Sequence, residues 1–215
     1  MNNLFSVFDP STGMMSMNWM STFIILLFTQ YKLWISENKK SILLKMMTMN
    51  LNKEMSMIMK YKGTNMMMMS LFMLILYNNL MGLLPYVFTS SSHLTFSLAM
   101  ALPMWMALMM YGWLKKTNMM FCHLVPTGTP SVLMPFMVII ETISNMIRPG
   151  SLAVRLTANM IAGHLLMSLL GNNSSTMMLS SLMIIFMMLM MFELAVAMIQ
   201  SYVFMTLMNL YSSEI

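Results

Sequence analysis

Ionisable and amide side chains stand inside two long apolar stretches in the second half of the chain. They are Glu141, Asn145, Arg148, Arg155, Asn159, His164, Glu193 and Gln200. A charged side chain inside a membrane span costs about 2.5–3.5 kcal/mol on insertion scales, and such residues mark ion pathways and proton relays. Carboxyl and imidazole groups can take up and release protons, whereas a guanidinium keeps its charge. This set is therefore the candidate functional site, and its buried polar groups need mutual pairing or water.

The spacing of these residues places most of them on one side of a helix. Five polar residues and one leucine follow one another at steps of four, three, four, three and four: Glu141, Asn145, Arg148, Leu152, Arg155 and Asn159. Steps of three and four keep side chains on one helical face. Glu193 and Gln200 are seven residues apart and also share a face. The sequence predicts a polar stripe on each of two neighbouring helices.

Helix packing is the competing explanation for part of this set. Each amide side chain could join two spans by a hydrogen bond, which contributes about 0.6 kcal/mol. His164 could be a packing histidine. Arg148 precedes Pro149 and could cap the helix or extend its charged end to the membrane surface.

Arg155 is harder to explain by packing. It has no acidic residue within one helical turn, and it lies deep in its apolar stretch. Since its guanidinium stays charged, a partner carboxylate must come from elsewhere. Two candidates remain open at this point: Glu193 of this chain, or an acidic residue of another subunit.

Composition places these residues in a membrane. Of the 215 residues, 59% are hydrophobic and only 8% are charged, against about 25% charged in soluble domains. This excludes a water-soluble fold. The net charge of +5 comes mostly from seven lysines between residues 32 and 62, so nucleic acid is not expected as a partner. The single cysteine, Cys122, belongs to no cluster of metal-ligating residues, so neither a metal nor another cofactor is expected.

Five apolar stretches have the length of a membrane span, which needs about 20 residues. They cover residues 14–35, 66–88, 95–114, 133–170 and 177–211. The sequence thus predicts an all-α, polytopic membrane protein that forms one membrane domain over residues 1–215.

The last two stretches are longer than a simple crossing requires. Residues 133–170 would form about 57 Å of helix where about 30 Å suffices. Such helices must tilt strongly, bend, or lie partly along the membrane. Pro149 and Gly150 offer a place for a bend.

The lysines orient the spans. Residues 37–62 hold six lysines and a second loop holds Lys115 and Lys116, whereas the alternate loops, 89–93 and 171–175, hold none. Basic loops stay on the side of synthesis, so both lysine loops and the C-terminus are expected on that side. Residues 37–62 also mix methionines with the lysines, which suits an amphipathic surface helix.

Three segments resemble one known family. Residues 151–171, SLAVRLTANMIAGHLLMSLLG, resemble the signature helix of the subunit a family of mitochondrial ATP synthases, the membrane stator beside the rotating c-ring. Residues 192–204, FELAVAMIQSYVF, resemble that family's final helix, and residues 4–12, LFSVFDPST, resemble its animal N-terminus. The 39 methionines, many in place of other aliphatic residues, are typical of animal mitochondrial genes.

The resemblance implies roles for the polar residues. Arg155 matches the family's essential arginine, and His164 and Glu193 match its polar pair in one half-channel. Glu141 matches the acid of the other half-channel. Asn159 and Gln200 match flanking polar positions, and Asn145 and Arg148 complete the expected proton-translocation set.

The family's mechanism would follow from these roles. Protons would pass from the intermembrane space by His164 and Glu193, load a carboxylate of the c-ring, and leave to the matrix by Glu141. The implied partners are the c-ring, the other membrane-sector and peripheral-stalk subunits, the lipid bilayer and protons. The implied location is the mitochondrial inner membrane. The chain has no glycine-rich phosphate loop, so covalent catalysis is not expected of it.

Two other classes of protein fit the pattern less well. A secondary transporter, or another ion-conducting membrane subunit, would also carry polar groups at mid-membrane, but the two halves of this chain show no internal repeat. A membrane-embedded hydrolase would need a motif such as HExxH or GxSxG, and the sequence contains neither.

Overall fold

The computed structural model describes residues 4–11, 15–24, 26, 38–58, 62–125, 128–172 and 179–214. Within these ranges the regular elements are all helical, and no strand occurs. The predicted all-α class is therefore confirmed. In chain order the elements are η1 (Leu4–Phe8), η2 (Met17–Ile24), α2 (Lys39–Ile58), α3 (Lys62–Gly82), η3 (Ser90–Ser92), α4 (Leu94–Lys115), α5 (Thr117–Leu124), α6 (Met134–Asn172) and α7 (Leu179–Glu214), where η marks a 3-10 helix.

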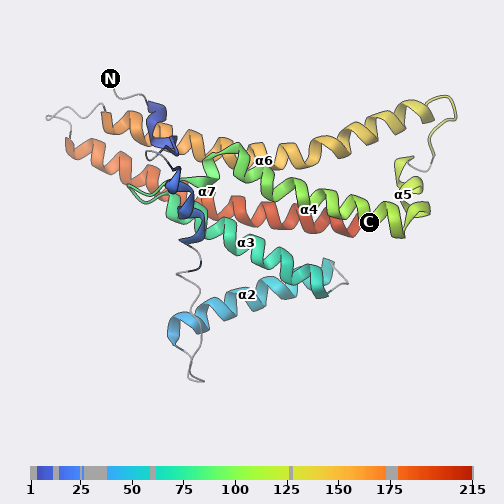
Figure 1. Ribbon diagram of the computed structural model, residues 1–215, viewed down its shortest axis with the longest axis horizontal. Coiled ribbons are helices and arrows are strands. Elements are labelled where there is room, and N and C mark those ends of the chain that lie inside the picture. Colours follow the sequence, from blue (N-terminus) through green and yellow to red (C-terminus); the bar gives the residue numbers. More distant parts are fainter. Residues whose placement is uncertain are drawn as a thin grey trace.

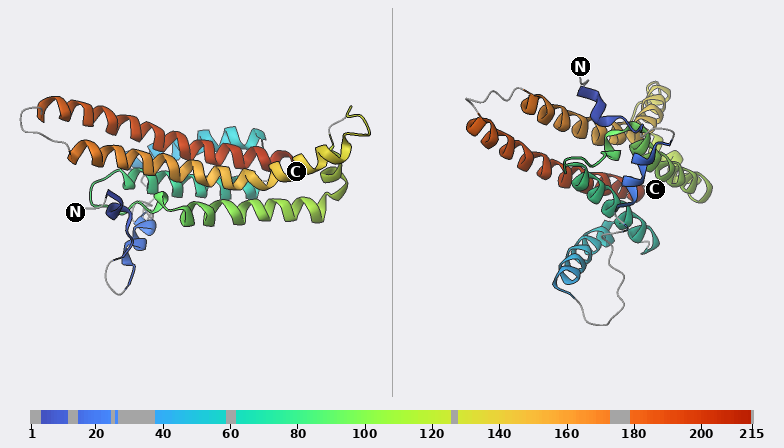
Figure 2. Two further views of the ribbon diagram at one scale, coloured as in Figure 1. Left: turned by 90° about the horizontal axis from the view of Figure 1, so that it is seen from above. Right: turned by 60° about the vertical axis from the view of Figure 1, so that its left-hand side comes forward.

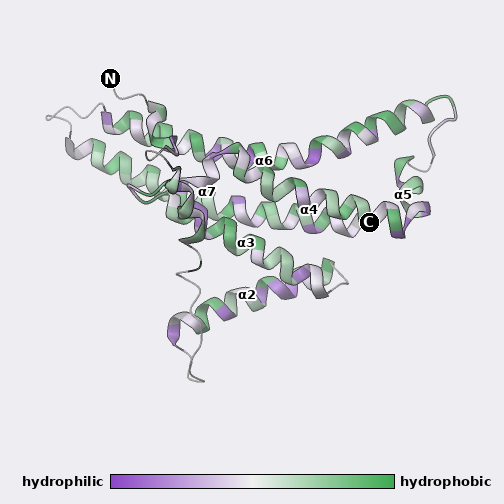
Figure 3. Cartoon of the chain, viewed as in Figure 1, coloured by the Kyte–Doolittle hydropathy of each residue, from purple (hydrophilic) through white to green (hydrophobic). Residues whose placement is uncertain are grey.

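Among the described residues, three helices are long and apolar enough to cross a bilayer. They are α4, α6 and the part of α7 from Ser181 to Ser213, and Figure 3 shows that all three are mainly hydrophobic. They match the stretches predicted at 95–114, 133–170 and 177–211 to within a few residues at each end. With 39 and 36 residues, α6 and α7 are about 58 and 54 Å long.

The two remaining predicted spans differ from the described helices. Most of the stretch 14–35 lies outside the described residues, and its described part, Met17–Ile24, is a 3-10 helix. The stretch 66–88 was placed too far along the chain, because α3 ends at Gly82 and a turn through Pro85 follows. Proline disfavours a helical conformation in the residue before it, which accounts for the early end.

The stretch 37–62 forms a helix, α2, from Lys39 to Ile58, and its place at the membrane surface stays a prediction. Figure 3 shows hydrophilic and hydrophobic segments alternating along it. One side of α2 packs against α3 and α7. There Met55 is 1% exposed, and the Nδ2 amide of Asn209 on α7 donates to its sulfur at 2.8 Å. The helix is thus docked on the other helices, while most of its apolar side chains are exposed, so it has no clear apolar face.

The short helix α5 has no counterpart among the elements predicted from the sequence. The region between the lysine pair and α6 carried no predicted element, yet Thr117–Leu124 form two turns of helix that pack against α4 and α6. An eight-residue helix is too short to give a clear periodic signal in the sequence.

Four helices run side by side along the long axis of the molecule: α3, α4, α6 and α7 (Figures 1 and 2). The main contacts join α3 to α7, α4 to α6, and α6 to α7. The core between them, which also includes one residue of α2, consists of Met55, Met68, Met69, Phe72, Ile75, Ala101, Leu152, Ala153, Leu156, Phe204, Met205 and Met208. Flexible methionine side chains suit this irregular space. Figure 1 shows that α6 curves along its length, and Pro149 lies within it.

The second part of the connection between α3 and α4 is buried, although its polar composition suggested a loop between spans. Thr89, Ser90, Ser91 and Ser92 are 1%, 2%, 0% and 4% exposed. They pack against α3, α4 and α6. The hydroxyl groups of Thr89 and Ser92 lie 3.0 Å apart, and Ser92 Oγ also donates to the Thr89 carbonyl at 2.7 Å. Local side-chain bonds of this kind let short polar residues enter a protein interior.

Candidate functional site

The polar stripe of α6 runs along the edge of its buried face. The buried residues of this helix are Pro149, Leu152, Ala153, Leu156, Thr157 and Met160. Leu152, which lies between Arg148 and Arg155 on the stripe, packs in the core. The stripe is therefore divided: Glu141, Asn145 and Arg148 lie on one side of Leu152, with Arg155 and Asn159 on the other.

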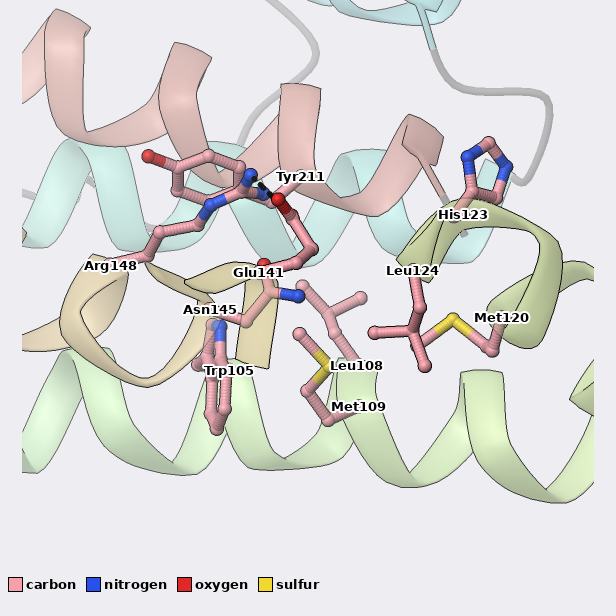
Figure 4. A pocket seen from close by; sticks show the side chains of 10 residues that line it. All are labelled: Trp105, Leu108, Met109, Met120, His123, Leu124, Glu141, Asn145, Arg148 and Tyr211. Atoms are coloured by element: carbon pink, nitrogen blue, oxygen red, sulfur yellow. Dashed lines mark ion pairs between the residues drawn. The ribbon is translucent and has the colours of Figure 1, made fainter. Parts of the chain in front are cut away.

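Glu141, Asn145 and Arg148 line a cavity of about 350 Å³ (Figure 4). Its other walls come from three helices. α4 contributes Trp105, Leu108 and Met109, α5 contributes Met120, His123 and Leu124, and α7 contributes Tyr211. The first part of the stripe thus faces a space enclosed by α4, α5, α6 and α7.

Arg148 has two partners at this cavity. Its Nη2 atom lies 3.6 Å from Glu141 Oε1. Its guanidinium carbon lies 5.0 Å from the centre of the Tyr211 ring. Figure 4 shows the guanidinium between the ring and the carboxylate. A cation over an aromatic face is attracted by the ring, so α7 helps to hold Arg148 beside Glu141. Neither capping of the helix nor extension to the membrane surface therefore explains the position of the Arg148 side chain.

Arg155 is exposed on α6. Among the described residues it forms no ion pair, and neither carboxylate oxygen of Glu193 has a hydrogen-bond partner. Of the two partners considered for Arg155, Glu193 is thus not bound to it. The exposed Arg155 is thus unpaired within the described part of the chain.

His164 and Glu193 lie in a second polar region, formed by α6 and α7. The carboxyl carbon of Glu193 would lie 2.8 Å from a β-carbon built on Gly163, so the carboxyl group rests against the residue before His164. The Nε2 atom of His164 and both carboxylate oxygens of Glu193 are buried without hydrogen bonds to described residues. Their direct hydrogen bond is thus absent, and contact through one water stays a prediction.

The ring of Phe8 contacts His164 in this second region. The rings of Phe8 and His164 meet edge to face, with their centres 6.1 Å apart. Phe8 ends η1, which packs against α6. The N-terminal segment thereby forms a wall beside His164.

The flanking amides do not join the helices by hydrogen bonds in the described part of the chain. Asn145, Asn159 and Gln200 are half-buried and make no side-chain hydrogen bond there. Besides Asn209, an amide on α3 links two helices: Asn79 Nδ2 donates to the Ala197 carbonyl of α7 at 3.5 Å. The packing explanation therefore suits Asn79 better than the three amides selected from the sequence.

The positions along α6 separate the two regions. Arg155 lies about 21 Å of helix from Glu141 and about 14 Å from His164. Nine residues make about two and a half turns, so Arg155 and His164 lie on opposite sides of α6. The fixed positive charge of Arg155 therefore lies along α6 between two groups of ionisable residues, and the cavity at Glu141 is lined by neither His164 nor Glu193.

Comparison with known proteins identifies the family. The family model described as ATP synthase A chain matches residues 13–213. The chain belongs to this family. It is 53% identical over 224 residues to ATP synthase subunit a of Anopheles quadrimaculatus, and 53% identical over 222 residues to that of Drosophila melanogaster. With ATP synthase subunit a of Locusta migratoria it shares 51% identity over 223 residues. Each match covers 100% of this chain and 99% of the relative.

For this member of the ATP synthase A chain family, sequence reasoning missed several residues at the two regions. These residues reach the two regions only because segments distant in the sequence pack together, and no local sequence pattern indicates such packing. They are Tyr211, Trp105, His123 and Phe8. Gly163 did carry a signal. A glycine inside a helix costs about 1 kcal/mol relative to alanine, so its presence suggests that something packs closely against it.

Proposed function

We propose that this chain is the stator subunit of a mitochondrial inner-membrane ATP synthase and forms two offset proton half-channels against the rotating c-ring. As a member of the ATP synthase A chain family, it is a proton-translocating membrane-sector subunit. The observation that carries the finer proposal is the exposed Arg155 between two separated ionisable regions. An exposed charge on a membrane helix needs an anionic partner, and a c-ring carboxylate supplies one.

The inlet half-channel would run past His164 and Glu193. Both groups can take up and release a proton. Their unpartnered buried atoms leave them able to bind water or a proton in transit. From there the proton loads a carboxylate on the c-ring.

The outlet half-channel would run through the cavity beside Glu141. After the ring has turned, its carboxylate gives up the proton on this side, and Glu141 accepts it. Arg148 holds the Glu141 carboxyl group in place by an ion pair of 3.6 Å. Asn145 offers hydrogen-bonding groups on the same wall.

Arg155 would keep the two half-channels apart. Its positive charge favours the ionised c-ring carboxylate and repels a proton that approaches directly. A continuous pore would dissipate about 2.3 kcal/mol per proton per 100 mV without turning the ring. Asn159 and Gln200 would flank this arginine.

The same proposal includes the membrane domain and the partners of the chain. The chain would form one membrane domain with about five spans, of which α6 and α7 cross strongly inclined because each far exceeds about 30 Å. Its partners would be the c-ring, the other membrane-sector subunits and the peripheral stalk. It would catalyse no covalent step itself. The family match does not favour a secondary transporter.

Replacement of Arg155 tests the proposal. Arg155→Gln is expected to abolish proton-driven ATP synthesis while the chain still inserts, because removal of a charge lowers the cost of membrane insertion. Arg155→Lys should not restore full coupling, since a desolvated ammonium can lose its proton. The measurements are ATP synthesis and passive proton leak in sealed inner-membrane vesicles.

Lys53→Gln provides the matched control, since it removes a positive charge from an exposed position of α2. Assembly of each complex is checked separately. Near-normal synthesis by an assembled Arg155→Gln complex would mean that Arg155 is structural and that this mechanism is wrong.

A further inference from the structure

The helix α5 closes one side of the cavity that contains Glu141. Its residues Met120, His123 and Leu124 line this space. His123 is exposed to the outside of the chain while it lines the cavity. Figure 4 shows it on the opposite side of the cavity from Arg148. One imidazole group thus lies both at the cavity and at the protein surface.

The other groups around the cavity divide it into a polar and an apolar part. The ionisable side chains are Glu141 and Arg148 on α6 and Tyr211 on α7, and these lie together (Figure 4). The wall from α4 is Trp105, Leu108 and Met109, which contains no ionisable group. Beside His123, α5 adds only Met120 and Leu124. His123 is therefore the one ionisable lining residue of this cavity away from the Glu141 group.

A proton released by Glu141 must still reach the aqueous phase. Arg148 lies beside Glu141, but it offers no site for a proton because its guanidinium stays charged. The cavity has an apolar wall of leucine and methionine between the two polar ends. An imidazole can accept and release a proton near neutral pH, which makes histidine a common proton shuttle.

We propose that His123 is the outermost proton carrier of the outlet half-channel, receiving protons from Glu141 across this cavity and releasing them to the matrix. The inference rests on the proposed function. In each transfer the carboxylic acid of Glu141 loses its proton through water in the cavity and becomes a carboxylate. The imidazole of His123 becomes imidazolium and then gives the same proton to bulk water. Proton pumping driven by ATP hydrolysis would use the steps in reverse.

Chemical rescue provides the test. In inverted inner-membrane vesicles the matrix face is outside, so an added buffer reaches His123 directly. His123→Ala in the complete ATP synthase is expected to slow proton-driven ATP synthesis several-fold at constant pH. Added imidazole should restore most of the rate, because a small mobile base can take the proton in place of the missing side chain. A merely structural role for His123 would not respond to imidazole.

Met119→Ala is the matched control, since Met119 is 53% exposed on the same helix and does not line the cavity. This variant and the unaltered protein should show normal rates that imidazole does not raise. A normal rate in assembled His123→Ala, or a loss that imidazole leaves unchanged, would overturn the inference. Arg155→Gln measured alongside separates the two proposals: if it blocks synthesis while His123→Ala is normal, only the role of His123 fails.

Discussion

Gly163 determines where the Glu193 carboxyl group can lie. A β-carbon at this position would come within 2.8 Å of the Glu193 carboxyl carbon and 2.9 Å of Oε1. Both distances are shorter than contacts that real β-carbons make. Any side chain at residue 163 would therefore force the Glu193 carboxyl group out of its present position.

Gly163→Ala is expected to impair ATP synthesis by moving the Glu193 carboxyl group away from His164. The change removes neither ionisable group, and alanine favours a helix by about 1 kcal/mol over glycine, so the variant should still insert. Gly150→Ala is the control on the same helix, because nothing lies within 4 Å of a β-carbon there. Equal rates of proton-driven synthesis for the two assembled variants would show that this close contact has no role.

The sequence predicted which candidate residues share a helical face, but not which residues of other helices they contact. The seven-residue spacing of Glu141 and Arg148 predicted a shared face, and the two side chains do form an ion pair. The ring of Tyr211 beside Arg148 comes from a helix more than 60 residues further along the chain. Contacts of that kind depend on how helices pack, and spacing within one helix contains no information about them.

At the scale of elements, α2 is attached to the bundle by very few buried side chains. Met55 is 1% exposed, whereas Met57 on the same helix is 89% exposed. Most other apolar residues of α2 are also exposed, among them Leu43, Met46 and Met47. The docking of this helix on α3 and α7 therefore depends strongly on Met55.

Met55→Ala is expected to loosen α2 from the bundle, because truncation of a buried methionine costs about 2–5 kcal/mol. It also removes the sulfur that accepts from Asn209. Met57→Ala deletes the same atoms from an exposed position and should have little effect. Limited proteolysis of vesicles with the matrix face outside would detect a difference in cleavage within α2. Identical cleavage of the two variants would contradict a packing role for Met55.

The length of each apolar run explains which elements the sequence could predict. The helices α4, α6 and α7 arise from long apolar runs, and their ends were predicted to within a few residues. The end of α3 was misplaced because the apolar composition continues past Gly82 to Phe88, although the helix does not. The short helix α5 became apparent only from its packing against α4 and α6.

At the scale of the whole molecule, the side of the membrane on which α5 lies reports the orientation of the chain. This helix follows the lysine pair at 115 and 116, and Cys122 is exposed on it. Because basic loops stay on the side of synthesis, a membrane-impermeant thiol reagent should reach Cys122 from the matrix face. The chain has a single cysteine, so Cys122→Ser should abolish labelling altogether. Labelling only from the intermembrane side would reverse the proposed topology.

The buried turn η3 also determines where foreign sequence can be added to this chain. An insertion between Thr89 and Ser92 would separate hydroxyl groups that bond to each other and would push a fully enclosed turn out of the bundle. Connections that tolerate epitope tags or circular permutation are exposed and make few contacts. In the segment between α5 and α6, Val132 is 85% exposed and Gly128 has open space around it. The described part of that segment, residues 128–133, is the suitable attachment point for a tag or a fluorescent reporter, and η3 is not.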